Sequence, residues 1–283
     1  MTASTPPRSE SRIHLDSTAH LMNSIGSALA DRLRLVPPPA RRPAPPALVL
    51  VAHGSRDPRA LTTVTALMDR IRELRPGLPV RLGHIELNEP LLTDTVAALG
   101  DTSAVLVPLL LSRGYHVKHD IPEMAAEAGL RARVAPPLGP HPLLVEALYD
   151  RLLEAGWPTA PDAATLRSSA VVLAAAGSRD PDSAKDTRRT ARLLAARLGV
   201  PVVPAYASAA APAVPTALRA LEARGRHRVA VASCFTAPGR FATQCAGAAP
   251  WLASAPLGDH PALARLVVNR YEQCLAAPAA RAA

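Results

Sequence analysis

The chain has 283 residues and a formal net charge of +9, and 48% of its residues are hydrophobic but only 3% aromatic. This length suits about two domains, the scarcity of aromatic side chains argues against a single-stranded nucleic-acid binder, and no apolar run approaches the roughly 18 residues of a membrane span. The three cysteines form no CxxC pair or disulfide framework, so we expect a cytoplasmic location, and the positive charge favours a polyanionic partner such as a small multi-carboxylate ligand.

Residues 1–46 differ from the rest of the chain. Residues 1–17 are polar, and a proline-rich stretch runs from Pro37 to Pro46. Such compositions are typical of disordered or extended segments. We therefore expect a disordered or partly helical extension with a Pro-rich linker, and a helix that docks on a partner is the alternative. The apolar residues spaced for a short amphipathic helix between these segments are Leu21, Met22, Ile25, Leu29 and Leu33.

From residue 47 onward, strand-like and helix-like segments alternate. The apolar run 47–52 is typical of a parallel strand that is buried on both faces. The pattern then predicts strands at 80–87, 104–111 and 131–135 and helices at 61–74, 91–99, 121–128 and 142–153. Strands that alternate with helices predict an α/β fold with a doubly wound parallel sheet.

Two motifs occur twice, in the same order. The sequence GSRDP at 54–58 returns at 177–181, and LGPHP at 138–142 returns as LGDHP at 257–261. Each motif is separated from its second copy by almost the same number of residues, and such agreement is hard to obtain by chance. We therefore expect two tandem similar lobes, each a doubly wound parallel sheet flanked by helices, at 47–156 and at 157–283.

Chemically reactive side chains follow the strands of the first repeat. His53 comes directly after the first strand, Glu86 and Glu89 lie near the end of the second, and His116 follows the third. Ligands bind beyond the carboxyl ends of strands in open parallel sheets, so these side chains share one edge. Imidazole and carboxylate ligands suit Fe(II), Co(II), Ni(II) or Zn(II).

The second repeat lacks both imidazoles. Ala176 stands where the first repeat has His53, and Phe241 stands where it has His116 when the preceding glycines are aligned. The metal chemistry should therefore belong to the first lobe alone, with the second as a degenerate copy.

Four separated segments carry a resemblance to a known family. VAHGSRDP at 51–58, IELNEP at 85–90, VPLLLSRGYHVKHDIP at 107–122 and APPLG at 135–139 occur in order. Together they resemble the sirohydrochlorin chelatase family, the cobalt- and iron-inserting enzymes of the cobalamin and sirohaem pathways. The resemblance implies two similar lobes with the tetrapyrrole bound between them. One departure is His119, where relatives are expected to have a carboxylate or an amide.

The resemblance implies a lyase whose substrates are a divalent metal and sirohydrochlorin or a related acidic tetrapyrrole. Fe2+ and Co2+ are the leading metals, with Ni2+ a third candidate, and no permanently bound cofactor is expected. No P-loop lysine motif is present, so ATP-driven insertion is not supported. We expect a monomer or homodimer that binds neither nucleic acid nor membrane. A carrier that binds tetrapyrrole or metal without catalysing insertion is the alternative.

By the same resemblance, His53 and His116 handle the metal and the protons, with Glu86 as the nearby carboxylate and Glu89 as its substitute. Arginine suits bidentate binding of the substrate's many carboxylates. The residues expected to bind the substrate are Ser55, Arg56, Arg113, Gly114, Tyr115, Lys118, Arg179 and Arg240.

The other histidines have more modest expected roles. His84 is expected to be a buried histidine with its hydrogen bond satisfied. His141 and His260 occupy matching turns of both repeats, including the one that lacks the imidazole pair, and are expected to be structural. For His119, a supporting role at the site and simple exposure to solvent both stay open.

Overall fold

The computed structural model describes residues 18–34, 45–127 and 132–277, and the chain forms two compact units, 1–44 and 45–283. In the first unit, α1 spans Thr18–Arg34 and carries the expected helical apolar pattern. Its side chains Leu21, Met22, Ile25 and Leu29 are between 41% and 71% exposed. The polar segment 1–17 and most of the expected Pro-rich linker lie outside the described residues.

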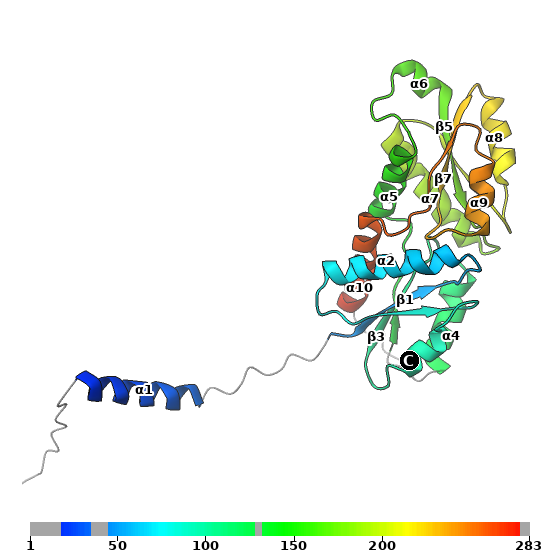
Figure 1. Ribbon diagram of the computed structural model, residues 1–283. Coiled ribbons are helices and arrows are strands. Elements are labelled where there is room, and N and C mark those ends of the chain that lie inside the picture. Colours follow the sequence, from blue (N-terminus) through cyan, green and yellow to red (C-terminus); the bar gives the residue numbers. More distant parts are fainter. Residues whose placement is uncertain (1–17, 35–44, 128–131, 278–283) are drawn as a thin grey trace, which may run out of the picture. The chain divides into compact units, whose positions relative to one another are not determined.

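The second unit contains two parallel sheets of four strands each (Figure 1). The first sheet has the order β2-β1-β3-β4, and the second has the order β6-β5-β7-β8. The first consists of β1 (Ala47–Ala52), β2 (Val80–His84), β3 (Ala104–Pro108) and β4 (Ala132–Val134). The second consists of β5 (Ser169–Ala175), β6 (Val202–Tyr206), β7 (Arg228–Ser233) and β8 (Leu252–Ala253). The expected fold class, α/β with two similar lobes of parallel sheet, is confirmed.

Helices alternate with these strands along the chain. In the first repeat they are α2 (Pro58–Leu74), α3 (Leu92–Ala97), the π-helix η1 (His116–Asp120), α4 (Ile121–Glu127) and α5 (Pro142–Glu154). In the second they are α6 (Ala163–Ser168), α7 (Pro181–Leu198), α8 (Val214–Glu222), α9 (Arg240–Gly247) and α10 (Pro261–Ala276). No helix in the described ranges is both long enough and apolar enough to span a bilayer.

The element boundaries differ from the sequence prediction at the carboxyl edge of the first sheet, where β2 and β3 end. β2 ends at His84, not at residue 87, and β3 ends at Pro108, not at 111. Ile85 and Glu86 still donate backbone hydrogen bonds to the carbonyls of Ala52 and His53, but they do so beyond the end of the strand. α2 begins earlier than predicted because the Asp57 carboxylate caps it by accepting from the backbone N–H of Arg59. Residues 128 and 131, an expected helix end and strand start, lie outside the described residues.

Two helices are exchanged between the repeats. α5 belongs to the first repeat but packs against α7 and β7 of the second, whereas α10 belongs to the second repeat but packs against α2 and β3 of the first. Figure 1 shows α10 beside α2, and α5 beside α7. One continuous apolar core therefore runs from Leu48 and Leu50 in β1 to Val171 and Leu173 in β5. The repeat boundary at 156/157 stays a prediction about the sequence, because the packing crosses it.

Each sheet has a separate core on its other face. On the first sheet, α3 and α4 cover the alternate residues of β1 and β3. On the second, α8 and α9 cover β5 and β7. Both sheets are thus buried on both faces, which explains the continuous apolar strands.

Candidate functional site

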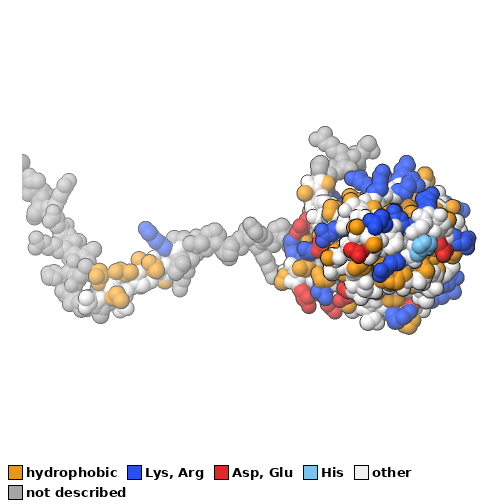
Figure 2. Space-filling model, turned by 90° about the horizontal axis from the view of Figure 1, so that it is seen from above, with side chains coloured by type: hydrophobic (Ala, Val, Ile, Leu, Met, Phe, Trp, Pro, Cys, Tyr) orange, Lys and Arg blue, Asp and Glu red, His pale blue; other side chains and the backbone are white. Residues whose placement is uncertain are grey.

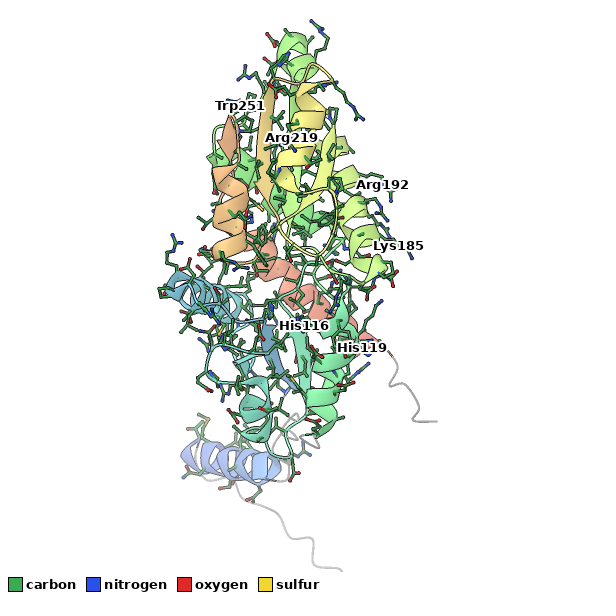
Figure 3. All side chains as sticks on the ribbon, turned by 90° about the vertical axis from the view of Figure 1, so that its right-hand side faces the viewer. His116, His119, Lys185, Arg192, Arg219 and Trp251 are labelled. Atoms are coloured by element: carbon green, nitrogen blue, oxygen red, sulfur yellow. The ribbon has the colours of Figure 1, made fainter. Side chains whose placement is uncertain are left out.

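Two imidazoles meet at the carboxyl edge of the first sheet. His53 is the first residue after β1, and His116 is the first residue of η1 in the connection that follows β3. Their ring centroids are 4.8 Å apart. Both side chains are partly exposed, at 47% for His53 and 39% for His116. Figure 3 shows His116 at the level where the two sheets meet.

A carboxylate lies beside His53. Glu86 Oε1 is 3.7 Å from His53 Nδ1, and the Glu86 backbone N–H donates to the His53 carbonyl at 3.0 Å. Glu89, the substitute considered from sequence, instead accepts from the backbone N–H of Leu91 at the start of α3, at 3.2 Å. The structure therefore places Glu86, rather than Glu89, next to the imidazole pair.

A second carboxylate holds His116 in place. The Nδ1–H of His116 donates to Asp120 Oδ2 at 2.5 Å, and Asp120 is one helical turn further along η1. A carboxylate on one ring nitrogen fixes the tautomer and leaves the Nε2 lone pair available for a metal. Sequence reasoning did not include Asp120 in the site, because the helix was predicted to begin at residue 121 and the spacing of four residues places two side chains together only within a helical segment.

These groups make an open donor set rather than a closed cage. Among residues 18–34, 45–127 and 132–277, no three His, Cys, Asp or Glu side chains lie close enough to form a metal site by themselves. The two imidazoles and the Glu86 carboxylate are nitrogen and oxygen donors, which suit divalent iron, cobalt, nickel or zinc. Such an arrangement has the chemistry to bind a divalent ion and to accept protons.

The second sheet faces this site with its own connections. A Cβ built on Gly239 would lie 3.4 Å from Ser55 Oγ, and one built on Gly114 would lie 3.6 Å from Ser178 Oγ. The loops after β1 and β3 therefore contact the loops after β7 and β5 across the lobes. This brings Ser55 and Gly114, two expected substrate-binding residues, to the boundary between the two sheets.

Several of the other expected substrate-binding side chains are exposed. Arg56, Arg179 and Arg240 reach solvent, and the guanidinium of Arg240 lies 4.9 Å from the ring centroid of Phe241. Tyr115 is 62% exposed and stacks on His119 at a centroid distance of 4.8 Å. Their binding of substrate stays a prediction.

Arg113 and Lys118, also expected to bind substrate, are engaged elsewhere. The guanidinium of Arg113 makes a bidentate ion pair with Asp186, at 2.7 and 2.9 Å. Lys118 Nζ contacts Asp180 at 2.7 Å and Asp182 at 2.9 Å. These carboxylates raise the pKa of both cations. In this structure the cations therefore join the two lobes, and a substrate carboxylate would have to displace a protein carboxylate to reach them.

Three further histidines have structural positions. His84 is 3% exposed and its Nδ1 lies 3.2 Å from the Pro90 carbonyl, which confirms a buried and satisfied histidine. His141 Nδ1 accepts from the N–H of Leu143, and His260 Nδ1 accepts from that of Ala262, each at 3.1 Å. They cap α5 and α10, so their expected structural role is confirmed.

A cavity of about 500 Å³ lies away from the histidine pair. Arg70, Arg151, Asp259 and His260 contribute to its lining. Arg70 pairs with Asp259, and Arg151 pairs with Glu154 and approaches Asp259, so each cation in this cavity already has a carboxylate partner. We therefore assign the chemistry of the site to the histidine pair and not to this cavity.

Comparison with known proteins agrees with this architecture. A solved structure of SirB from Bacillus subtilis with Fe3+ superposes with a TM-score of 0.67 at 26% identity, covering 81% of this chain and 95% of that one. The fold and site thus define a two-lobed α/β protein of the chelatase type. The sequence matches the model of the CbiX family over residues 47–155 and 170–274, and the chain belongs to that family.

Two curated relatives are similar over part of the chain. The sirohydrochlorin ferrochelatase of Bacillus subtilis is 31% identical over 176 residues, which are 59% of this chain and 64% of the relative, somewhat less than two thirds. The sirohydrochlorin cobaltochelatase of Methanopyrus kandleri is 30% identical over 137 residues, which are 38% of this chain and 96% of the relative.

Proposed function

We propose that this protein is a sirohydrochlorin chelatase, a lyase that inserts Fe2+ or Co2+ into an acidic tetrapyrrole. The observation that carries the proposal is the pair of imidazoles, His53 and His116, 4.8 Å apart at the carboxyl edge of one sheet in a chain of the CbiX family. Relatives that share this family are named for iron and for cobalt insertion. The donor set accepts both metals, so the choice between them rests with metal supply as much as with affinity.

The reaction exchanges one metal ion for two protons. The divalent ion replaces the hydrogens of two pyrrole N–H groups, so the protein must deliver the ion and accept the protons. A neutral imidazole binds such an ion without trapping it and also takes protons near neutral pH, because its unperturbed pKa is about 6.5. In this proposal Asp120 holds the His116 ring with Nε2 available, and Glu86 supports His53 from 3.7 Å.

The substrate is an anion with several carboxylates, and we place it between the two lobes. Arg56, Arg179 and Arg240 are exposed, and Arg56 and Arg179 follow β1 and β5, one at each edge that faces the boundary. Arginine binds carboxylates through two parallel hydrogen bonds. Figure 2 shows Lys and Arg side chains spread over the visible face of the second unit, in keeping with the net charge of +9.

The test is anaerobic metal insertion into sirohydrochlorin, followed by absorbance, with Fe2+, Co2+ and Ni2+ in parallel. We expect multiple turnovers, and His116→Ala is expected to lower kcat by roughly a hundredfold or more because it removes a ligand and base. His227→Ala is the matched control, since His227 is an exposed histidine in the turn between α8 and β7. Near-normal turnover in His116→Ala would contradict the assigned role of the pair.

The carrier hypothesis predicts a different result in the same assay. A carrier would bind sirohydrochlorin tightly and show no acceleration over the uncatalysed rate at substoichiometric protein. The cytoplasmic location and the absence of a bound cofactor stay predictions, as do the oligomeric state and the absence of nucleic-acid or membrane partners.

A further inference from the structure

The geometry points to the start of α7, in the second repeat, as the element that positions His116 in the first. We call the four residues involved, Asp180, Asp182, Ser183 and Asp186, the α7 anchor. They hold the segment from Ser112 to Lys118, which ends in the first turn of η1. The proposal rests on the proposed function for its kinetic consequences, and it makes Asp186 a positioning residue for metal insertion.

The strongest contact of the α7 anchor lies immediately before the π-helix. Asp186 accepts three hydrogen bonds from Arg113: from the backbone N–H at 2.9 Å, from Nε at 2.9 Å and from Nη2 at 2.7 Å. The Asp186 residue is only 5% exposed. Bidentate arginine–carboxylate pairs have a fixed planar geometry, and here the same carboxylate also holds the main chain. Only two residues, Gly114 and Tyr115, lie between Arg113 and His116, so fixing the backbone at Arg113 fixes where η1 begins.

The other contacts hold both ends of the segment. Ser112 Oγ and Ser183 Oγ are 2.9 Å apart, and Ser183 is 4% exposed. Lys118, within η1, contacts both Asp180 and Asp182. Hydrogen bonds from Lys118 and Lys185 lower the pKa of Asp182 to about 2, so this carboxylate is charged at neutral pH. The segment that presents His116 is thus bound to α7 before and within the π-helix.

The repeat provides an internal control. Asp57 matches Asp180 in the shared GSRDP motif, so Arg59, Ala60 and Thr63 of α2 stand where α7 has Asp182, Ser183 and Asp186. The loop opposite α2 has Ala237 and Pro238 where the first repeat has Ser112 and Arg113. Asp57 pairs with Arg59 of its own helix instead of crossing between lobes. The anchor therefore exists only on the side whose loop carries the imidazole.

Because only one of the two repeats has this anchor, its role can be distinguished: it positions His116 and does not only attach the two lobes to each other. The lobes are joined elsewhere by a shared core and by other ion pairs, such as Arg70 with Asp259 at 3.3 Å. An anchor needed only for attachment would be expected in both copies of a repeat. Because it occurs only beside His116, we assign it to the placement of that side chain relative to His53. Small displacements of a reacting group cost large factors in rate.

The experiment compares Asp186→Asn with Asp259→Asn, which weakens the Arg70 pair between the lobes but does not touch η1. We expect Asp186→Asn to lower kcat about tenfold while leaving KM for sirohydrochlorin within about twofold, because substrate contacts are retained. Asp259→Asn should leave both constants near those of the unaltered protein. Arg113→Met should reproduce the loss of kcat, and the double variant should lose little more than either single one.

Two readouts are independent of turnover. Titration of the full-length apoprotein with Co2+ should show weaker binding in Asp186→Asn than in Asp259→Asn. Imidazole 15N spectra should show a changed or broadened His116 resonance only in Asp186→Asn. If the unaltered protein shows no insertion, the proposed chelatase function fails, and these two measurements still decide the anchor.

Three results would overturn the proposal. The first is a kcat, Co2+ affinity and His116 resonance in Asp186→Asn equal to those of the unaltered protein. The second is an equal loss in Asp259→Asn, which would mean that any weakening between the lobes has the same effect. The third is a raised KM in Arg113→Met with unchanged kcat, which would return Arg113 to direct substrate binding.

Discussion

At the scale of single residues, a glycine decides whether the site can form. Gly54 has φ of 106°, and a Cβ at this position would lie 1.9 Å from the backbone oxygen of Glu86. The chain must therefore pass very close to the connection that carries Glu86, immediately after His53. Gly177 in the second repeat has φ of 90° and the same close approach, to the oxygen of Ser208.

This pair gives a matched test of where the chemistry resides. Gly54→Ala and Gly177→Ala should each destabilise the protein by at least about 1–3 kcal/mol, because both force an alanine to a positive φ and bring its Cβ against a backbone oxygen. Only Gly54→Ala displaces Glu86, so only this variant should lose Co2+ binding as well. Thermal unfolding and Co2+ titration measure the two effects. Equal Co2+ binding by the two variants would remove Glu86 and His53 from the metal site.

At the scale of elements, two histidine caps make helix stability depend on pH. His260 Nδ1 caps α10 by accepting a hydrogen bond, which requires the neutral imidazole. Burial, assisted by Arg151, lowers the pKa of His260 despite the neighbouring Asp150, whose carboxylate is 3.3 Å from Nε2. Burial and Arg270 lower the pKa of His141 at α5 in the same way.

The sign of the pH effect follows from these lowered values. A histidine whose folded-state pKa is below its unfolded value stabilises the protein above about pH 6.5, and this stabilisation is lost as the pH falls through the folded value. We therefore expect stability to fall between pH 7 and pH 5. His260→Asn keeps a cap that does not titrate and should reduce this fall, whereas His260→Ala should cost about 1 kcal/mol at pH 7. Urea unfolding at both pH values checks this, and an unchanged slope in His260→Asn would contradict it.

At the scale of the whole molecule, the exchanged helices make the two repeats interdependent. One of the two apolar faces of the first sheet is covered by α10 together with α2, and Leu263, Leu266 and Val267 of α10 are fully buried. The hydroxyl of Tyr271 in α10 also donates to the Pro46 carbonyl at 2.7 Å, next to the start of β1. A fragment that ends near residue 156 would expose this face to water.

We therefore expect the fragment 45–156 to lack a cooperative unfolding transition. Mixing it with the fragment 157–277 should restore one, because α5 and α10 then find their partner sheets. Circular dichroism and calorimetry of each fragment and of the mixture are the measurements. Native-like cooperative unfolding of 45–156 alone would show that the first repeat folds independently of α10.

The strands, the two lobes and the shared edge of the site residues could be predicted from the sequence alone, because each of them depends on a local pattern of residues. The apolar run before the first GSRDP motif identified β1, and the repeat of two motifs identified the paired lobes. Parallel strands end at a common edge, so His53, His116 and Glu86 were predicted to share that edge, where the structure places them. The same reasoning also put β2 three residues too long, because the segment beyond His84 continues alongside β1 without belonging to the strand.

Only the tertiary structure decided what the charged side chains contact. Arg113 and Lys118 were expected to face the substrate, yet they bind Asp186, Asp180 and Asp182, more than 60 residues later in the chain. The sequence likewise gave no indication that α5 and α10 pack on the sheet of the other repeat. The burial of a strand can be predicted from the hydrophobicity of its own residues. An ion pair or a helix exchange depends instead on which distant segments the folded core brings together, and no local pattern in the sequence indicates which segments these are.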